Sequence, residues 1–542
     1  MPEISDVAIV GSGPSGALAA AHLVEAGLQV AMLDVAHDDD RYRQIVPDSS
    51  FQELRQSDTG QRRYFLGDDL EGVPSGEIKV GAQLTPPRQF VTRDTERWLP
   101  TRGDQFAPMQ SLALGGLGAA WGAAAFTWSD HELRRAGIHE PGFQRHYEAV
   151  AQRIGISADP ADDTSRLCFS GVATVQPPLP IDTGAEHVWS AYRAKRERFL
   201  ARGLALGRTP LAALSEPRFE RAANPAFDMD FWSDSRRSVF RPRYLIESLE
   251  RNPGFRLVRN RLVFRFESRE NEVAIHCLDT ANGETVVHKA RRLLLCAGAL
   301  NSARIALYSL DAWEERAPLL CNPYVYLPCV QPRMLGRAAR DDRHSLSQLV
   351  AIFSPPDAPE DPLSCQLYGY RSLLLFKLVK EMPLPPWAGL QVARLLMNAM
   401  VIAGLHHSDT PGPKKTLGIV PGSDGPLPVL DLEYQAGEEE NTRQRSRERA
   451  LARILVALGV VPYGRISPGA GSSIHYAGTL PIGEGTARFE TRADGRLHAA
   501  RRVYVGDSAG FRYLPAKGLT LSIMANALRV AEHVLRDLAT GH

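Results

Sequence analysis

The sequence predicts an α/β fold, α+β in its overall content, whose main domain is a Rossmann-like nucleotide-binding domain. Three features predict it: a strand, glycine-rich loop and helix at the N-terminus, an apolar strand followed by a helix near the middle, and a strand ending in Gly-Asp close to the C-terminus. The chain has 542 residues, more than one hydrophobic core usually needs, so we expect a second domain.

The N-terminal unit begins with the mostly apolar run 6–10, which is typical of a buried parallel strand. A glycine-rich loop follows, and the small, largely apolar run to Leu23 predicts a helix. A second apolar strand, 29–33, ends at Asp34, whose carboxylate can accept hydrogen bonds from ribose hydroxyls. This combination predicts a dinucleotide site and fits NAD as well as FAD, the alternative being a plain α/β turn.

Each part of the loop has a physical task. The loop comprises Gly11, Ser12, Gly13, Pro14, Ser15 and Gly16. Gly11 permits a tight turn, Gly13 lets the backbone approach a pyrophosphate, and Gly16 lets the helix lie close to the strand. The free N–H groups and the dipole of the helix N-terminus then stabilise the pyrophosphate.

The C-terminal unit favours FAD over NAD. A strand ends in Gly506 and Asp507, and in flavoproteins of the glutathione-reductase type such an aspartate meets the ribityl chain of FAD. Apolar residues at helical spacing predict a helix over 519–538. Its start at Gly518 and Leu519 can direct the helix N-terminus at the flavin pyrimidine ring, where negative charge gathers on reduction.

The middle of the chain supports the same domain. The apolar run 292–299 predicts a buried strand, and 301–308 predicts a helix after it. Shorter strands are expected at 255–258, 262–266, 273–276 and 285–287. They fit the antiparallel meander of a large FAD domain, in which the backbone of Val263 could pair with adenine.

Four patches of the sequence resemble the glucose–methanol–choline (GMC) oxidoreductases. They are the N-terminal loop, the run 114–122 with Gly115, Gly116, Gly118 and Trp121, the run 296–302 with Ala297 and Gly298, and the C-terminal pair 475–479 and 505–507. The second patch is similar to the family's Gly-Gly-x-Ser/Gly-x-x-Trp-x-Gly flavin loop and leans slightly towards its sugar-oxidising branch. The patches follow the family's order along the whole chain.

The resemblance implies a Rossmann-like FAD-binding domain and a discontinuous substrate-binding domain built on an antiparallel sheet and helices. The FAD-binding domain is expected to comprise residues 1–39, 105–158, 237–312 and 469–542. The substrate-binding domain is expected to comprise residues 40–104, 159–236 and 313–468.

The family transfers a hydride from a CH–OH carbon to flavin N5 while a histidine takes the hydroxyl proton. His475 occupies this His-x-x-Gly-Thr position, and a neutral imidazole is a suitable base. The alternative is a structural histidine that caps a loop. The family usually places a second His or Asn just before its last helix, but Gly518 stands there. Lys517 could supply a donor or a cation instead, or be a solvated or FAD-facing lysine.

Some sugar-oxidising relatives bind flavin covalently through a histidine ahead of the tryptophan. Here Ala119 and Ala120 precede Trp121, so we expect noncovalent FAD. We expect His406 and Tyr513 to contact the substrate. The adjacent pair His406 and His407 lacks a third spaced ligand, and none of the six cysteines forms a C-x-x-C pair, so no metal site is expected.

The apolar segment 391–403, with Leu373–Phe376 before it, predicts a core element of the substrate domain. Contact with a membrane or with a lipophilic substrate is the alternative. Lys+Arg 63 against Asp+Glu 62 gives no basic stripe for nucleic acid. No secretory signal begins the sequence and no apolar run spans a bilayer, so we expect a cytoplasmic protein.

The sequence therefore predicts an FAD-dependent dehydrogenase or oxidase of a small-molecule CH–OH substrate: a sugar, or a hydroxyl of a secondary metabolite or glycolipid precursor. The electron acceptor is left open, oxygen or another oxidant. Because Gly518 replaces the second His or Asn, isomerisation, elimination or desaturation is the alternative reaction. The third hypothesis is a non-enzymatic nucleotide-binding or interaction protein. The intact motifs at both ends of the chain argue against it.

Overall fold

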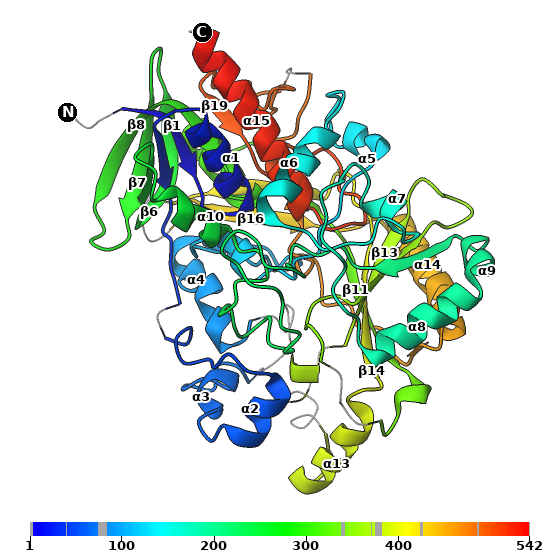
Figure 1. Cartoon of the computed structure of the whole chain (residues 1–542). Coiled ribbons are helices and arrows are strands. Elements are labelled where there is room, and N and C mark those ends of the chain that lie inside the picture. The colour runs from blue at the N-terminus through cyan, green and yellow to red at the C-terminus, as the bar shows by residue number, and fades with distance from the viewer. Residues whose placement is uncertain are drawn as a thin grey trace.

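The computed structural model describes residues 4–39, 41–73, 84–337, 342–369, 371–373, 375, 382–422, 427–484 and 487–540. Two large sheets organise the chain, one of seven strands and one of six. Figure 1 shows both termini beside the first sheet, with the second sheet on the opposite side of the molecule. The mixed α/β fold class predicted from the sequence is confirmed.

The first sheet is the predicted nucleotide-binding sheet. Its strands, in spatial order, are β5 (Phe255–Val258), β2 (Val30–Leu33), β1 (Ser5–Val10), β8 (Thr285–Leu295), β7 (Val273–Asp279) and β6 (Arg261–Ser268), and β19 (Val503–Val505) also pairs with β8. Strands β5, β2, β1 and β19 run parallel to β8, and β1 and β19 pair with its C-terminal half. Strands β8, β7 and β6 form an antiparallel meander.

One strand lies elsewhere than expected. Residues 255–258 were predicted in the meander, but β5 pairs in parallel with β2. The helix α10 (Pro242–Leu249) precedes β5 and returns the chain to the same end of the sheet, which is the connection that a parallel strand requires. The predicted strands 285–287 and 292–299 belong to one continuous strand, β8, which ends at Leu295 rather than at residue 299.

Helices cover both faces of this sheet. Val7 and Ile9 of β1 pack towards α1 (Pro14–Glu25) and α15 (Thr520–Thr540), which lie side by side in Figure 1. The alternate residues Ala8 and Val10 pack towards α11 (Ala299–Ser309). A strand that is buried on both faces shows this alternation of side chains. The glycine-rich loop follows directly after the last residue of β1.

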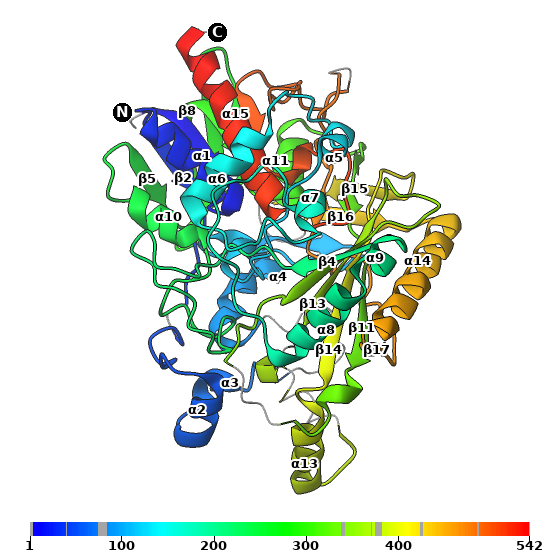
Figure 2. The same cartoon turned by 45° about the vertical axis from the view of Figure 1, so that its right-hand side comes forward.

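The second sheet is antiparallel throughout. Its strands, in spatial order, are β17 (Val461–Pro462), β11 (Tyr324–Val330), β14 (Met400–His406), β13 (Leu363–Tyr368), β12 (Leu349–Phe353) and β4 (Leu204–Arg208). Apolar side chains of one face pack on α8 (Thr183–Ala194) and α14 (Glu438–Ala457), which flank the sheet in Figure 2. The opposite face carries polar and aromatic side chains.

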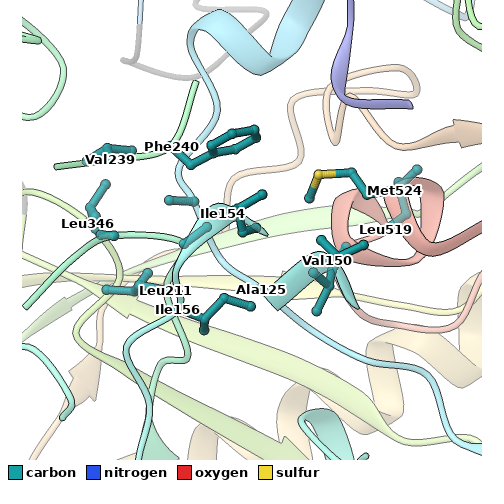
Figure 3. Close-up of a cluster of buried hydrophobic side chains, with 14 of the residues drawn as sticks. Ala125, Val150, Ile154, Ile156, Leu211, Val239, Phe240, Leu346, Leu519 and Met524 are labelled. Atoms are coloured by element: carbon teal, nitrogen blue, oxygen red, sulfur yellow. The ribbon is translucent and has the colours of Figure 1, made fainter. Parts of the chain in front are cut away.

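Smaller elements complete the fold. They are the helices α2 (Phe51–Ser57), α3 (Arg62–Phe65), α4 (Thr95–Trp98), α5 (Asp130–Arg135), α6 (Gln144–Ile154), α7 (Ser165–Cys168) and α9 (Arg196–Leu200), a four-stranded sheet of β3 (Thr101–Arg102), β16 (Val429–Tyr434), β15 (Lys415–Val420) and β9 (Ala317–Pro318), and the pair β10 (Leu320–Cys321) and β18 (Tyr476–Ala477). Figure 3 shows a core cluster in which Val150 and Ile154 of α6 lie with Leu519 and Met524 at the start of α15.

The apolar segment 391–403 is not one element. It contains the end of α13 (Pro386–Leu396) and the start of β14, and Trp387 of α13 is 72% exposed. Leu374 and Phe376, expected to belong with it, lie outside the described residues. Among the described helices, none combines the length and the apolar content that a bilayer crossing needs.

Candidate active site

A large cavity lies where the two sheets face each other. Its empty volume, with the open mouth counted, is about 2120 Å³. The ends of β1, β2, β8 and β19 line one part, and the polar face of β11, β13 and β14 lines another. The cavity therefore extends from the strand ends of the first sheet to the polar face of the second sheet.

Most residues singled out from the sequence line this cavity. They are Gly11, Gly13, Pro14, Ser15, Asp34, Gly116, Gly118, Trp121, Val263, Ala297, Gly298, His406, His475, Asp507, Gly518 and Leu519. Gly16, Gly115 and Gly506 do not line it but lie directly beside residues that do. Segments from both ends of the chain thus meet in one place.

The glycine-rich loop is shaped by close backbone contacts. Gly11 has a φ of +99°, and a Cβ added there would lie 2.4 Å from the carbonyl oxygen of Cys296. A Cβ on Gly16 would lie 2.0 Å from the carbonyl oxygen of Gly11. Helix α1 begins at Pro14 with no side-chain cap, so its first N–H groups remain free for an anion.

Two buried aspartates hold the loops of this site. Asp34 accepts hydrogen bonds from the backbone N–H of Ser12 at 2.5 Å and of Ala36 at 2.9 Å. Asp507 accepts from the N–H of Gly298 at 2.8 Å and from the hydroxyl of Ser302 at 2.6 Å. Burial raises the pKa of Asp34, and it raises that of Asp507 to about 6. These bonds join the ends of β1, β2, β8 and β19.

The second glycine loop packs directly on the first. It forms a short 3₁₀ helix, Gly116–Ala119, and a Cβ on Gly118 would lie 2.8 Å from Cγ of Pro14. Trp121 lines the cavity while its indole N–H donates to the carbonyl of Phe240 at 2.8 Å. Only a loop without side chains approaches the helix start this closely.

Unpaired polar atoms occur among the residues that line the cavity. Arg304 is 1% exposed, and its Nε and Nη1 have no partner among the described residues, although Nη2 donates to the carbonyl of Pro100 at 3.0 Å. Burial lowers the pKa of Arg304 to about 9. The side-chain oxygens of Gln110 and Asn301 are likewise buried without a described partner. Buried polar groups normally have partners, so this lining fits a polar ligand such as the adenosine diphosphate half of FAD.

His475 lies just before β18, and its tautomer is set by Asn322. Nδ1 of His475 is 3.1 Å from Oδ1 of Asn322. The amide nitrogen of Asn322 donates to the carbonyls of His407 at 2.7 Å and Pro515 at 3.0 Å, so the amide can offer only its oxygen to the imidazole. Nδ1 therefore carries the proton, and Nε2 has a lone pair that meets no partner among the described residues.

His406 is the last residue of β14 and stacks on His475. The ring centroids are 4.9 Å apart and the planes are inclined by 20°. Tyr324 lies on His406 as well, with ring centroids 4.3 Å apart. Burial lowers the pKa of His475 to about 4, and burial together with the neighbouring imidazoles lowers the pKa of His406 well below its usual value. Both rings are neutral at neutral pH.

Lys517 and Tyr513, also predicted for the site, do not line the cavity. The ammonium of Lys517 is buried, donates to Glu132 at 2.7 Å and also to the carbonyl of Leu167. The ring of Tyr513 is covered by the guanidinium of Arg135, 3.7 Å from its centroid. A buried ammonium needs an anionic partner, and Glu132 supplies it away from the cavity, which argues against a catalytic Lys517.

Several residues at this site were not found from the sequence. They are Asn322, which holds His475 from behind, and Tyr324, Tyr326, Gln366 and Tyr368 on the polar face of the second sheet. The alternating Tyr324-x-Tyr326 and Gln366-x-Tyr368 pairs were the available signal. Alternation shows that two residues share a face, but not which face meets the cofactor.

One group of possible metal ligands occurs among the described residues. Glu140, His146 and Glu532 have ligand atoms within 4.8 Å of one another, outside the cavity lining. The guanidinium of Arg145 pairs with both carboxylates and supplies the positive charge there.

Comparisons with known proteins agree with the site. Residues 4–44 match the family model described as an FAD binding domain. The 6'''-hydroxyparomomycin C oxidase of Streptomyces lividus is 24% identical over 568 residues, covering 98% of this chain and 92% of that protein.

Solved structures share the fold over nearly the whole chain. Pyridoxine 4-oxidase from Mesorbium loti matches with a TM-score of 0.58 at 15% identity, covering 97% of this chain and 98% of that one. An FAD-dependent oxidoreductase from Chaetomium thermophilum matches with a TM-score of 0.60 at 11% identity, covering 99% and 100%. With the FAD-binding motif, the full-length similarity and the cavity described above, the chain is an FAD-dependent oxidoreductase that resembles the glucose–methanol–choline enzymes.

Proposed function

We propose that this protein oxidises a CH–OH group of a sugar or of a hydroxylated secondary metabolite, with His475 as the base. Bound FAD would supply the chemistry of accepting the hydride. The observation that carries the proposal is the Asn322–His475 hydrogen bond, which leaves Nε2 of His475 as a lone pair in a cavity lined by FAD-binding motifs. A base needs such an unprotonated nitrogen within reach of the substrate hydroxyl.

The surroundings of His475 suit this role. Its low pKa keeps the imidazole neutral across the physiological range. When Nε2 accepts a proton, the ring becomes cationic, and the carboxamide oxygen of Asn322 faces the N–H on its other side. That fixed dipole stabilises the charge as it develops, without reorganisation of the protein.

The wall opposite the flavin loops suits a hydroxylated ring. Tyr324, Tyr326 and Tyr368 offer aromatic faces and hydroxyls, and Gln366 offers an amide. Among the described lining residues, the carboxylates are Asp34 and Asp507, both engaged by backbone N–H groups of the nucleotide-binding loops. We therefore favour a neutral hydroxylated substrate over one that needs an acidic partner for an ammonium group.

Noncovalent FAD is part of the proposal. Ala119 and Ala120 stand at the positions where a covalent linkage through histidine would occur, and both are buried beside the flavin loop. Precipitating the protein with acid should therefore release all of its FAD into the supernatant. Flavin that stays with the pellet would contradict noncovalent binding.

A second candidate is a reaction other than net alcohol oxidation, such as an isomerisation, elimination or desaturation. Gly518, at the place of the family's second His or Asn, favours it, because it provides no side chain to the substrate.

Anaerobic flavin reduction separates the two candidates. The FAD-loaded protein is mixed with D-glucose, pyridoxine, benzyl alcohol and 6'''-hydroxyparomomycin C in turn, and the visible flavin absorbance is followed. Alcohol oxidation predicts bleaching by at least one alcohol and recovery of the colour when oxygen or a dye is added. His475→Ala should keep FAD bound and bleach roughly 10²–10⁴ times more slowly. Conversion of an alcohol to an isomer without bleaching would overturn the first candidate.

A further inference from the structure

His406 is the second imidazole that lines the cavity, whereas Gly518 stands where the resemblance places a second polar side chain. At Gly518 a Cβ would lie 3.2 Å from Cδ2 of Phe126, so a side chain there would crowd this buried ring. Lys517 next to it is held by Glu132. His406 comes from a different domain, but its ring stacks on His475 at 4.9 Å and lines the same cavity.

The position of His406 is rigid. Strand β14 is an inner strand of the second sheet, and His406 is in register with Tyr324 of β11 and Ser364 of β13. The rings of Tyr324 and His475 lie against it. The next residue, His407, points to the other side of the sheet, where it pairs with Glu448 at 3.2 Å. His406 therefore presents a fixed ring to the cavity.

The two nitrogens of His406 are not equivalent. Nδ1 is buried without a described hydrogen-bond partner. A buried donor without an acceptor is rarer in proteins than a buried acceptor without a donor. The favoured tautomer of this neutral ring thus leaves a lone pair on Nδ1 and carries its proton on Nε2. His475 has the opposite arrangement, because Asn322 holds its proton on Nδ1.

The stacked pair thus offers one acceptor and one donor to the cavity. These two groups match the hydroxyl of an alcohol, which donates its hydrogen to an acceptor and whose oxygen accepts a hydrogen bond from a donor. We propose that His406 is a second catalytic residue, whose Nε2–H donates a hydrogen bond to the hydroxyl oxygen while Nε2 of His475 takes the hydroxyl proton. This inference rests on the proposed alcohol oxidation.

The step balances without any further reactant. The O–H bond breaks and a new N–H bond forms on His475. The carbon–hydrogen bond breaks with its electron pair, which bound FAD would accept as hydride, and the carbon–oxygen bond becomes double. His406 keeps its proton throughout, and its hydrogen bond holds the oxygen as negative charge develops there and passes into the carbonyl.

His406→Phe tests the proposal, because it keeps an aromatic ring between Tyr324 and His475 and removes the donor. The alcohol that bleaches the wild-type flavin fastest in the panel above is used with both proteins. We expect the maximal reduction rate of His406→Phe to fall roughly 10²-fold, as on loss of an oxyanion donor. His406→Asn, which retains an N–H donor, should recover part of the loss. His139→Phe makes the same change at an exposed histidine and should reduce flavin as the wild type does.

The outcomes separate the two proposals. Reduction of His406→Phe at the wild-type rate would show that the ring only packs, and would overturn the role of His406 alone. Failure of all the alcohols to bleach the wild type would overturn alcohol oxidation and this role with it. Should His406→Phe not retain FAD, ¹⁵N NMR of the wild-type imidazoles decides. A proton on Nε2 of His406 supports the proposal, and a proton on Nδ1 overturns it.

Discussion

The side-chain oxygen of Asn322 lies 3.1 Å from Nδ1 of His475 and thereby decides which imidazole nitrogen carries the proton. The two residues are 153 positions apart in the chain. Asn322 is buried and cannot turn its amide around, because its nitrogen donates to the carbonyls of His407 and Pro515.

Replacing Asn322 should slow catalysis without removing FAD. In Asn322→Leu the proton of His475 can move to Nε2, which then cannot accept the substrate proton. We expect flavin reduction roughly 10- to 100-fold slower, since one positioned hydrogen bond to a developing charge is lost. FAD content, from the absorbance ratio of flavin to protein, should be unchanged. Asn322→Leu that reduces flavin at the wild-type rate would contradict the tautomer argument.

The pH profile should report the buried imidazole. His475 acts in its neutral form, and burial lowers its pKa from 6.5 to about 4. As the pH falls, the active form therefore persists until the pH approaches 4 and is lost only below it. The measurement is kcat/KM against pH for the free enzyme, over the range in which the protein stays folded. An acid limb near the ordinary histidine pKa would show that His475 is solvated or is not the base.

Two glycines of the N-terminal loop should respond differently to alanine. A Cβ on Gly13 meets nothing within 4 Å, so Gly13→Ala should fold normally but bind FAD less tightly, since the backbone can no longer approach the pyrophosphate. Gly11→Ala should lower the stability of the apoprotein as well, because φ is +99° and the Cβ meets Cys296. Thermal unfolding of both apoproteins and titration with FAD measure this. Equal unfolding temperatures would contradict the assignment.

Arg304 should contribute to FAD binding. Its guanidinium is buried and has two nitrogens unpaired among the described residues, and Arg304 lines the cavity. We expect Arg304→Gln to raise the Kd for FAD about tenfold, the loss of one hydrogen bond to a charged group. The quenching of FAD fluorescence gives the Kd. Arg259→Gln, at an exposed arginine, is the matched control, and an unchanged Kd in Arg304→Gln would remove Arg304 from the site.

Lys517 should matter for stability rather than for catalysis. Lys517→Met leaves Glu132 buried without its cation, which typically costs about 3–5 kcal/mol of unfolding free energy. Lys517→Met combined with Glu132→Gln should recover much of this, because Gln can also serve the capping box of α5. Denaturant unfolding measures the stability of each variant. A folded, FAD-loaded Lys517→Met protein that no longer reduces flavin would restore a catalytic role to Lys517.

The nucleotide-binding half of the site could be predicted from the sequence because its determinants are local. A glycine loop between a strand and a helix, Asp34 at the end of the next strand and Gly506-Asp507 before the last helix each carry their own backbone requirement. The strands and helices around them follow from runs of apolar residues, and the structure has them within a few residues of the predicted bounds. The error at β5 arose because the sequence of a short strand does not reveal its partner.

The sequence by itself thus determined the fold class, and it predicted the FAD loops and His475 from motifs of recognisable form. Only the tertiary structure decided the partners of His475, because Asn322 and His406 meet it through sheet register and the packing of distant segments. The tertiary structure also decided that Lys517 pairs with Glu132, because the carboxylate that meets this ammonium comes from a segment 385 positions away in the chain. Burial, which sets the low pKa of both imidazoles, is likewise a property of the folded chain and not of any motif.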